Sequence, residues 1–275
     1  MKKRIFSLIM VTLMVFSLAA CKKDSTESST AGEDNSLKYI QDNGKLILGL
    51  DDAFPPMGFR DDNDKIVGFD IDLAQAVCDK LGVELELQPI EWDAKEQELN
   101  TKNIDCIWNG LSVTPDNEKN MTLSKSYMAN EISLVVTNGS AITSMADMAG
   151  KKLAVQSGSS AEETLDADEN KAFKDSLGQV NPFSDYVTAL MDLETGNSDA
   201  VLMDSVVANY MITDAGKDYK VLGESLLEDK YAIGFRKGDQ ALCDAVWNAL
   251  KELKADGTVA EISTKWFGSD VTTID

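Results

Sequence analysis

The alternation of apolar and polar residues along the chain predicts short strands and amphipathic helices. Lys45–Leu50 has the length and apolar content of a strand, and a helix is expected after Phe69 with Asp70 as its N-cap. One face of that helix is apolar at helical spacing and contains Leu73, Ala74, Val77, Cys78 and Leu81. Gly82 ends the helix, and Val83–Leu87 alternates apolar and acidic residues as a half-buried strand does. The order is a strand–loop–helix–strand unit.

Similar units follow in the middle of the chain. A short helical run, Ala94–Leu99, precedes a buried strand predicted at Ile104–Trp108. Thr114 is a suitable N-cap with Pro115 at the first helical position. A second group of elements starts near Ile132, and its strand Lys152–Val155 leads into a helix that opens with Ser159 and Ser160.

The C-terminal part is predicted to return to the first group of elements. Tyr231–Phe235 is an apolar run of strand length that can cross back. A helix follows and ends at Gly257, and its apolar face contains Leu242, Val246, Leu250 and Leu253. Thr258 and Glu261 have the spacing of a capping box for the last helix.

A short internal repeat supports two related α/β lobes. Residues 99–108 and 193–202 share Leu, Thr, Asn and Asp at matching positions, and each copy joins a helix to a buried strand. The strands end in polar residues, Asn109 in one copy and Asp204 in the other. Asp51 likewise follows a strand, with Phe54 close behind it. Because α/β domains bind ligands at the carboxyl ends of strands, we expect these side chains to meet at one cleft.

The first 36 residues are predicted to lie outside the fold. Three basic residues precede the uncharged run Ile5–Ala20, which is typical of a signal peptide over residues 1–20. The sequence Leu18–Cys21 resembles a bacterial lipoprotein box, in which Cys21 is lipidated; an ordinary cleavage site beside a chance cysteine is the alternative. Residues 21–36 are polar and small, as expected of a flexible tether.

Composition narrows the function further. The net charge is −21, and removal of residues 1–20 changes it to −24, which argues against nucleic acid and anionic membrane surfaces as partners. The chain has no histidine, which excludes the commonest general base and histidine metal sites. No cofactor or metal is expected. With Cys21 lipidated, three cysteines remain as small core residues; the sequence leaves a disulfide between two of them open.

Several motifs together resemble a known family. Gly49–Leu73 reads G-x-D…P-P…F…D…G-F-D-I-D-L, and W-D at Trp92, N-G-L-S-V-T at Asn109 and W-F-G at Trp266 continue the match. This pattern resembles the amino-acid-binding extracytoplasmic solute receptors of ABC importers. The resemblance implies a two-lobed periplasmic-binding-protein-like fold with two crossover strands. Residues 37–130 and 232–275 would form lobe 1, and residues 131–231 would form lobe 2.

The resemblance also implies a binding site. Asp51 and Asp204 match the carboxylates that receive the ligand's ammonium, and Phe54 and Trp92 match residues that cover its side chain. An ammonium has three donors and suits several oxygen acceptors. The remaining predicted contacts are Asn109, Gly110, Ser112, Asn117, Ser159 and Ser160.

Asn117 departs from the family pattern. Family members usually carry an arginine at this position, which forks onto the ligand's carboxylate, whereas Asn117 is a neutral amide. Either another group binds the carboxylate, or the ligand lacks a free one. We predict that backbone N–H groups at Ser112–Val113 and Ser159–Ser160 replace it, with Arg60 and Lys119 as charged alternatives.

The sequence therefore predicts the solute-binding component of an ABC importer. It would capture a small amino-acid-like solute by lobe closure and deliver it to a membrane permease, as a lipid-anchored extracytoplasmic monomer. Two alternatives stay open. One is a carboxylate-dependent enzyme of dehydratase type on the same scaffold, and the other is a ligand-sensing subunit.

Overall fold

The computed structural model describes residues 34–213 and 215–275. The signal peptide, Cys21 and the tether up to residue 33 lie outside the described residues. The helices are α1 Ser36–Asn43, α2 Phe69–Leu81, α3 Lys95–Asn100, α4 Pro115–Asn120, α5 Ser160–Asp166, α6 Lys171–Ser176, α7 Tyr186–Glu194, α8 Ser205–Thr213, α9 Gln240–Ala255 and α10 Thr258–Phe267. The strands are β1 Lys45–Leu50, β2 Ala53–Phe54, β3 Gly58–Arg60, β4 Ile66–Val67, β5 Glu84–Pro89, β6 Cys106–Ser112, β7 Met121–Leu123, β8 Met128–Thr137, β9 Lys152–Gln156, β10 Gln179–Phe183, β11 Ala200–Asp204 and β12 Tyr219–Arg236.

One mixed sheet runs through both lobes in the order β10-β9-β11-β8-β12-β6-β1-β5, with β7 paired to β12. The first lobe contains the parallel strands β1, β5 and β6, and the second contains the parallel strands β9, β10 and β11. Strands β8 and β12 are antiparallel neighbours and connect the lobes, as the two predicted crossings require. The predicted two-lobed α/β fold is confirmed.

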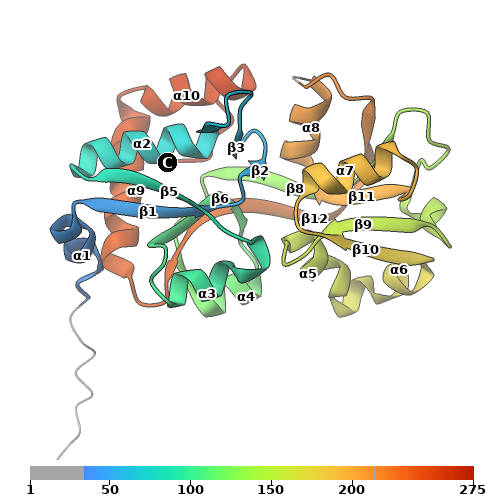
Figure 1. Ribbon diagram of the computed structural model, residues 1–275, viewed down its shortest axis with the longest axis horizontal. Coiled ribbons are helices and arrows are strands. Elements are labelled where there is room, and N and C mark those ends of the chain that lie inside the picture. The colour runs from blue at the N-terminus through green and yellow to red at the C-terminus, as the bar shows by residue number, and fades with distance from the viewer. Residues whose placement is uncertain (1–33, 214) are drawn as a thin grey trace, which may run out of the picture. The chain divides into compact units, whose positions relative to one another are not determined.

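Helices cover both faces of this sheet (Figure 1). In the first lobe, α2 and α10 lie on one face and α3 and α4 on the other, and α9 runs past the level of β1 and β5. In the second lobe, α7 and α8 lie on the first of these faces, and α5 and α6 on the second. The predicted apolar face of α2 is buried, and Gly82 ends this helix in the left-handed region with φ of 72°. Cys78, Cys106 and Cys243 are buried and unpaired, as small core residues.

The internal repeat has a structural meaning. Asp105 and Asp199 precede β6 and β11, and the side chain of each accepts a hydrogen bond from the backbone of a neighbouring strand. The Asp105 carboxylate accepts from Ile47 N–H at 2.9 Å, and the Asp199 carboxylate accepts from Lys152 N–H at 2.8 Å. These aspartates thus align the strands whose ends form the site.

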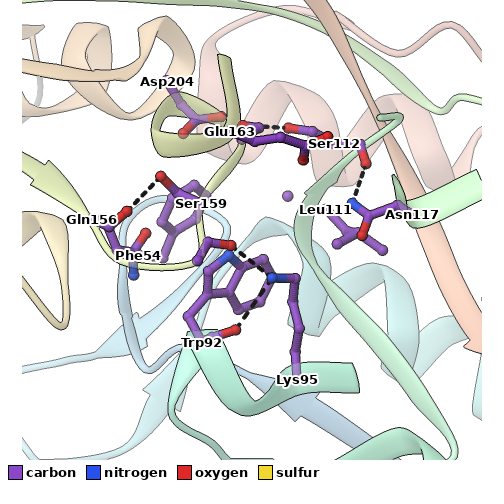
Figure 2. A pocket seen from close by; sticks show the side chains of 13 residues that line it. Phe54, Trp92, Lys95, Leu111, Ser112, Asn117, Gln156, Ser159, Glu163 and Asp204 are labelled. Carbon is purple, nitrogen blue, oxygen red and sulfur yellow. Dashed lines mark hydrogen bonds between the residues drawn. The ribbon is translucent and has the colours of Figure 1, made fainter. Parts of the chain in front are cut away.

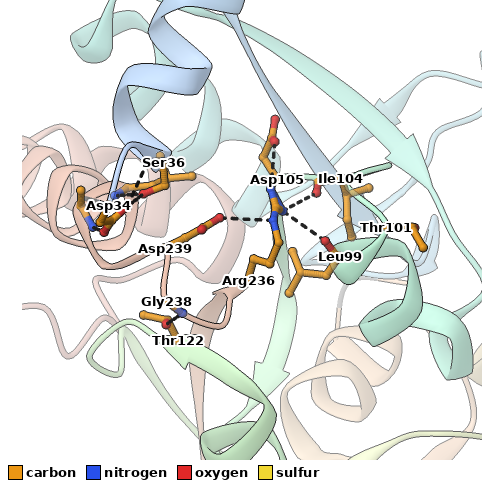
Figure 3. Close-up of polar contacts among 12 residues, drawn as sticks. Asp34, Ser36, Leu99, Thr101, Ile104, Asp105, Thr122, Arg236, Gly238 and Asp239 are labelled. Carbon is orange, nitrogen blue, oxygen red and sulfur yellow. Dashed lines mark hydrogen bonds and ion pairs between the residues drawn. The ribbon is translucent and has the colours of Figure 1, made fainter. Parts of the chain in front are cut away.

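In the first lobe, this junction is strengthened by Arg236. Its guanidinium donates to Leu99 O and Ile104 O, both at 3.1 Å, and lies 3.7 Å from the Asp105 carboxylate (Figure 3). Asp34 and Ser36 lie at the beginning of α9, where they accept from the N–H groups of Ala241 and Leu242. The two residues are therefore attached to the first lobe, although they were predicted to belong to the tether.

Three local predictions were wrong. Asp70 is not the N-cap of α2; Gly68 takes that position, and Asp70 is fully buried inside the first turn. Thr258 and Glu261 form no capping box, because Gly257 is the N-cap of α10 and the Thr258 hydroxyl donates to Asp256 instead. The buried strand β6 continues to Ser112, so Asn109 and Gly110 belong to the strand and do not follow it. Thr114 and Pro115 begin α4 as predicted.

Candidate functional site

A cavity of about 30 Å³ lies between the two lobes, at the carboxyl ends of their strands (Figure 2). The first lobe contributes side chains from β2, the segment around α3, β6 and α4. The second contributes the loop from β9 to α5 and the end of β11. The lining residues are Phe54, Trp92, Lys95, Gly110, Leu111, Ser112, Asn117, Gln156, Gly158, Ser159, Ser160, Glu163 and Asp204.

Every predicted binding residue lines this cavity except Asp51 and Asn109. The Asp51 carboxylate accepts from the Gln156 side-chain amide at 2.7 Å and from Ala53 N–H at 2.8 Å. Asn109 accepts the Asp51 N–H through its side-chain oxygen at 3.1 Å. Burial raises the pKa of Asp51 to about 6, against the lowering effect of the Ala53 and Gln156 hydrogen bonds. A direct ligand contact of Asp51 therefore stays a prediction.

Asp204 is the most deeply buried carboxylate of the lining, with 3% of its surface exposed. One of its oxygens accepts from Asn130 Nδ2 at 2.6 Å and from the Tyr231 hydroxyl at 2.8 Å. No lysine or arginine of the described residues lies within 4 Å of it. Burial raises the pKa of Asp204 to about 7, and the charge of Asp229 adds to this. A cation in the cavity would compensate this charge.

A chain of hydrogen bonds joins this acidic group to the other lining residues. Asn130 Nδ2 also donates to Asp229 at 2.8 Å, and Asp229 accepts from the Ser112 hydroxyl at 2.6 Å. The Ser160 hydroxyl lies 2.9 Å from that of Ser112. Because a hydroxyl has one proton and Ser112 gives its own to Asp229, Ser160 donates to Ser112. The chain connects the two lobes across the cavity.

Gly110 has a conformation that its place in the lining requires. Its φ is +64°, and a Cβ there would lie 2.7 Å from a ring carbon of Phe54. Its N–H donates to the buried Asp70 carboxylate at 2.8 Å, and Tyr127 donates to the same oxygen. Burial raises the pKa of Asp70 to about 7. Asp70 therefore orients the backbone of the site instead of capping a helix.

Asn117 points at Ser112 and donates to its carbonyl at 2.9 Å (Figure 2). Two of the N–H groups predicted to hold a carboxylate are engaged elsewhere, since Val113 donates to Lys230 O and Ser159 donates to Gln156 O. Neither charged alternative lines the cavity. Arg60 pairs with the Asp52 carboxylate at 2.6 Å, and Lys119 is exposed.

Lys95 is a basic residue that lines the cavity, and it was not predicted from the sequence. It begins α3 and is 8% exposed. Its ammonium donates to Gly158 O at 2.7 Å, lies 3.4 Å from Trp92 O, and stands 5.3 Å from the Trp92 ring centre. Burial lowers the pKa of Lys95, opposed by the carboxylates of Glu96 and Glu163.

The other missed lining residues are Leu111, Gln156, Gly158 and Glu163. Gln156 is the last residue of β9, so the rule that ligands bind at strand ends could have found it. Lys95 and the buried Leu99 are four residues apart and share one helix face, which is an unusual place for a lysine. Glu163 carries no comparable signal, because an acidic residue in the first turn of a helix is ordinary.

Comparison with known proteins decides the family. The family model for bacterial extracellular solute-binding proteins, family 3, matches residues 46–269. The chain belongs to this family. Among its relatives, the solute-binding protein is 31% identical to the L-cystine-binding protein TcyJ of Escherichia coli (strain K12), over 87% of this chain and 89% of the relative. It is also 31% identical to the L-cystine-binding protein TcyA of Bacillus subtilis (strain 168), over 98% of this chain and 99% of the relative.

A solved structure supports the same assignment. The ABC uptake transporter substrate-binding protein of Streptococcus pneumoniae, solved with bound histidine, superposes on the solute-binding protein with a TM-score of 0.84. The two are 40% identical, and the alignment covers 88% of this chain and 99% of that one. Over residues 34–213 and 215–275, no helix of the solute-binding protein has the length and apolar character needed to cross a membrane.

Proposed function

We propose that this solute-binding protein captures an amino acid between its two lobes and delivers it to the permease of an ABC importer. The observation that carries the proposal is Asp204, a buried carboxylate that lines the cavity with no lysine or arginine of the described chain within 4 Å. A buried carboxylate needs a charged or strongly donating partner to stay ionised. The ammonium group of an amino acid supplies both the charge and the donors.

The remaining lining fits this ligand. Phe54 and Trp92 offer ring faces for a side chain, and the hydroxyls of Ser112 and Ser160 offer further polar contacts. Two relatives are named for binding L-cystine, and the Streptococcus pneumoniae structure contains bound histidine; both compounds carry an α-ammonium group. Micromolar affinity requires only about −8 kcal/mol, which a few charge-assisted hydrogen bonds and ring contacts can supply.

Binding without chemical conversion is the expected activity. The named relatives are binding proteins, and this supports a receptor over the dehydratase-type enzyme. The protein would act as a monomer outside the cytoplasmic membrane, held by a lipid on Cys21. Cys21 lies outside the described residues, so the anchor rests on the sequence alone.

Calorimetry tests the proposal. The purified protein, unfolded and refolded to remove co-purified solutes, is titrated with each of the twenty L-amino acids and with L-cystine. We expect saturable binding of at least one of them, with a dissociation constant in the micromolar range or below. Mass spectrometry of the recovered ligand should find it unchanged. A protein that binds none of these compounds contradicts the proposal, and one that converts its ligand is the enzyme.

A further inference from the structure

Lys95 holds a positive charge in an unusual setting for a soluble protein. The residue is only 8% exposed, yet no carboxylate lies within 4 Å of its ammonium among the ion pairs of the described residues. Its two hydrogen-bond acceptors are the backbone carbonyls of Trp92 and Gly158, which carry no full charge. A buried ammonium is stabilised mainly by an opposite charge. The carboxylates of Glu96 and Glu163 act on this charge from beyond 4 Å, so the ammonium that lines the cavity is only partly compensated.

The cavity has the charge pattern of an amino-acid zwitterion. Figure 2 shows Asp204 and Lys95 at opposite ends of the group of lining side chains. Glu163 also lines the cavity and favours the charged form of Lys95, but it forms no ion pair with Lys95 within 4 Å and is half-exposed. A ligand with its ammonium at Asp204 would therefore have its carboxylate on the side of Lys95.

Several other carboxylate-binding groups in this region are occupied. The side-chain amide of Asn117 donates to Ser112 O, and the N–H groups of Val113 and Ser159 donate to backbone carbonyls. The Gly158 N–H donates to the Glu162 carboxylate at 2.7 Å. Lys95 differs from these groups because an ammonium has three donors and uses one well-formed bond, to Gly158 O, in this arrangement.

We propose that Lys95 is the residue that reads the ligand's carboxylate, in place of the arginine expected at the position of Asn117. The inference rests on the proposed function, since it requires an amino-acid ligand in this cavity. Lys95 would select amino acids with a free carboxylate and reject their carboxamides. Its bond to Gly158 O, which joins the lobes, would make the same side chain report on carboxylate binding and on closure.

The test compares each free amino acid that binds wild-type protein with its own carboxamide, by calorimetry. Wild type should prefer the acid by at least about tenfold, because hydrogen bonds between charged groups are worth that much. Lys95→Met should lower affinity for the acid by at least about tenfold and for the carboxamide much less, so that the preference disappears. Lys95→Arg, which keeps the charge, should retain the preference. Lys119→Met removes an exposed lysine of nearby α4 and should behave as wild type.

The outcomes separate the two proposals. If Lys95→Met lowers affinity for acid and carboxamide by the same factor, Lys95 is only a closing contact and the inference is wrong, while the proposed function stands. A wild type that binds both compounds equally also overturns the inference alone. A wild type that binds no amino acid overturns the proposed function, and the inference with it. Should the Met variant not fold, Lys95→Gln tests the same preference, because it keeps a donor for Gly158 O.

Discussion

At the scale of single residues, the site combines charge with burial. Asp204 and Lys95 are both at least nine-tenths buried and carry opposite charges, and neither forms an ion pair within the described chain. Residues of this kind lower the stability of the ligand-free protein and gain most when a ligand of matching charge binds. Burial of a charge without an ion pair is therefore the cause of both the lower stability and the gain on binding.

Asp204→Asn should separate these two effects. The pKa of Asp204 is raised from its ordinary value of 3.8 to about 7, so the folded protein holds this proton more tightly than the unfolded chain. The contribution of the protonated carboxyl to stability is thus full below about pH 4 and is lost as pH rises through about 7. The asparagine side chain carries no charge, so the ligand-free variant should unfold at a higher temperature than wild type at about pH 8, and the two should approach each other at about pH 5.

Asp204→Asn should weaken ligand binding, although it should raise the thermal stability of the ligand-free protein. Loss of a charge-assisted contact should weaken amino-acid binding by at least about tenfold at about pH 8, measured by calorimetry beside thermal unfolding. Asp62→Asn, in the exposed turn between β3 and β4, is the control and should alter neither quantity. Wild-type affinity in the Asp204→Asn variant would show that the ammonium binds elsewhere.

At the scale of elements, the loop from β9 to α5 meets the first lobe very closely. A Cβ on Gly158 would lie 2.6 Å from Asp93 Cα and 3.2 Å from Asp93 N, and both atoms belong to the backbone. Gly150, in the same lobe, has almost the same φ, +71° against +69°, and nothing lies within 4 Å of a Cβ built on it. The two glycines thus form a matched pair.

Gly158→Ala and Gly150→Ala should both lose about 1 kcal/mol of stability from the left-handed backbone. Only Gly158→Ala should weaken ligand binding and leave the lobes farther apart, because the new methyl group meets Asp93 when the lobes close. Calorimetry gives the affinity, and small-angle scattering with saturating amino acid gives the radius of gyration. Equal affinity losses in the two variants would attribute the effect to backbone strain alone.

At the scale of the whole molecule, the proposed function requires lobe closure and the predicted anchor. Trp92 and Trp108 differ in their surroundings. Trp92 lines the cavity, whereas Trp108 is fully buried in the core of the first lobe beside Tyr127. We therefore expect the fluorescence of Trp92 to report ligand binding.

Addition of the amino-acid ligand should change tryptophan emission and reduce the radius of gyration. Trp92→Phe should remove most of the emission change, while Trp108→Phe should keep it, because the buried Trp108 indole stays in the same apolar surroundings in both states. Fluorescence titration of the two variants checks this. An emission change that survives in Trp92→Phe and vanishes in Trp108→Phe would place the ligand elsewhere.

The predicted lipid anchor is Cys21. The sequence Leu18–Cys21 predicts a lipid on this cysteine, so the exported wild-type protein should fractionate with membranes. Cys21→Ser should leave the precursor unprocessed or release the protein. Cys78→Ser, at a buried cysteine of α2, is the control and should not change the fractionation. Wild-type protein that is wholly soluble after export would contradict the anchor.

The amino-acid sequence alone predicted several of the elements, and together with the family resemblance it predicted the two-lobed fold. Strand β1, the Gly82 helix end and the Thr114 cap follow from residues adjacent in the chain, and local propensity acts over that range. The repeat at Asp105 and Asp199 was likewise visible, because it encodes the same local junction twice. The strand-end rule pointed to Asp204 and Phe54, and the family resemblance supplied the other predicted residues that line the cavity.

Tertiary structure alone decided what each polar side chain touches. The Asp51 carboxylate accepts a hydrogen bond from Gln156, which is 105 residues away. The Asp70 carboxylate accepts one from the N–H of Gly110, 40 residues away, and does not cap the helix. Lys95 faces the cavity because α3 packs its Leu99 face inward, which turns the lysine beside Trp92 and Gly158. Periodicity shows which residues share a face, but the partner of a buried charge depends on which lobe surface closes over it.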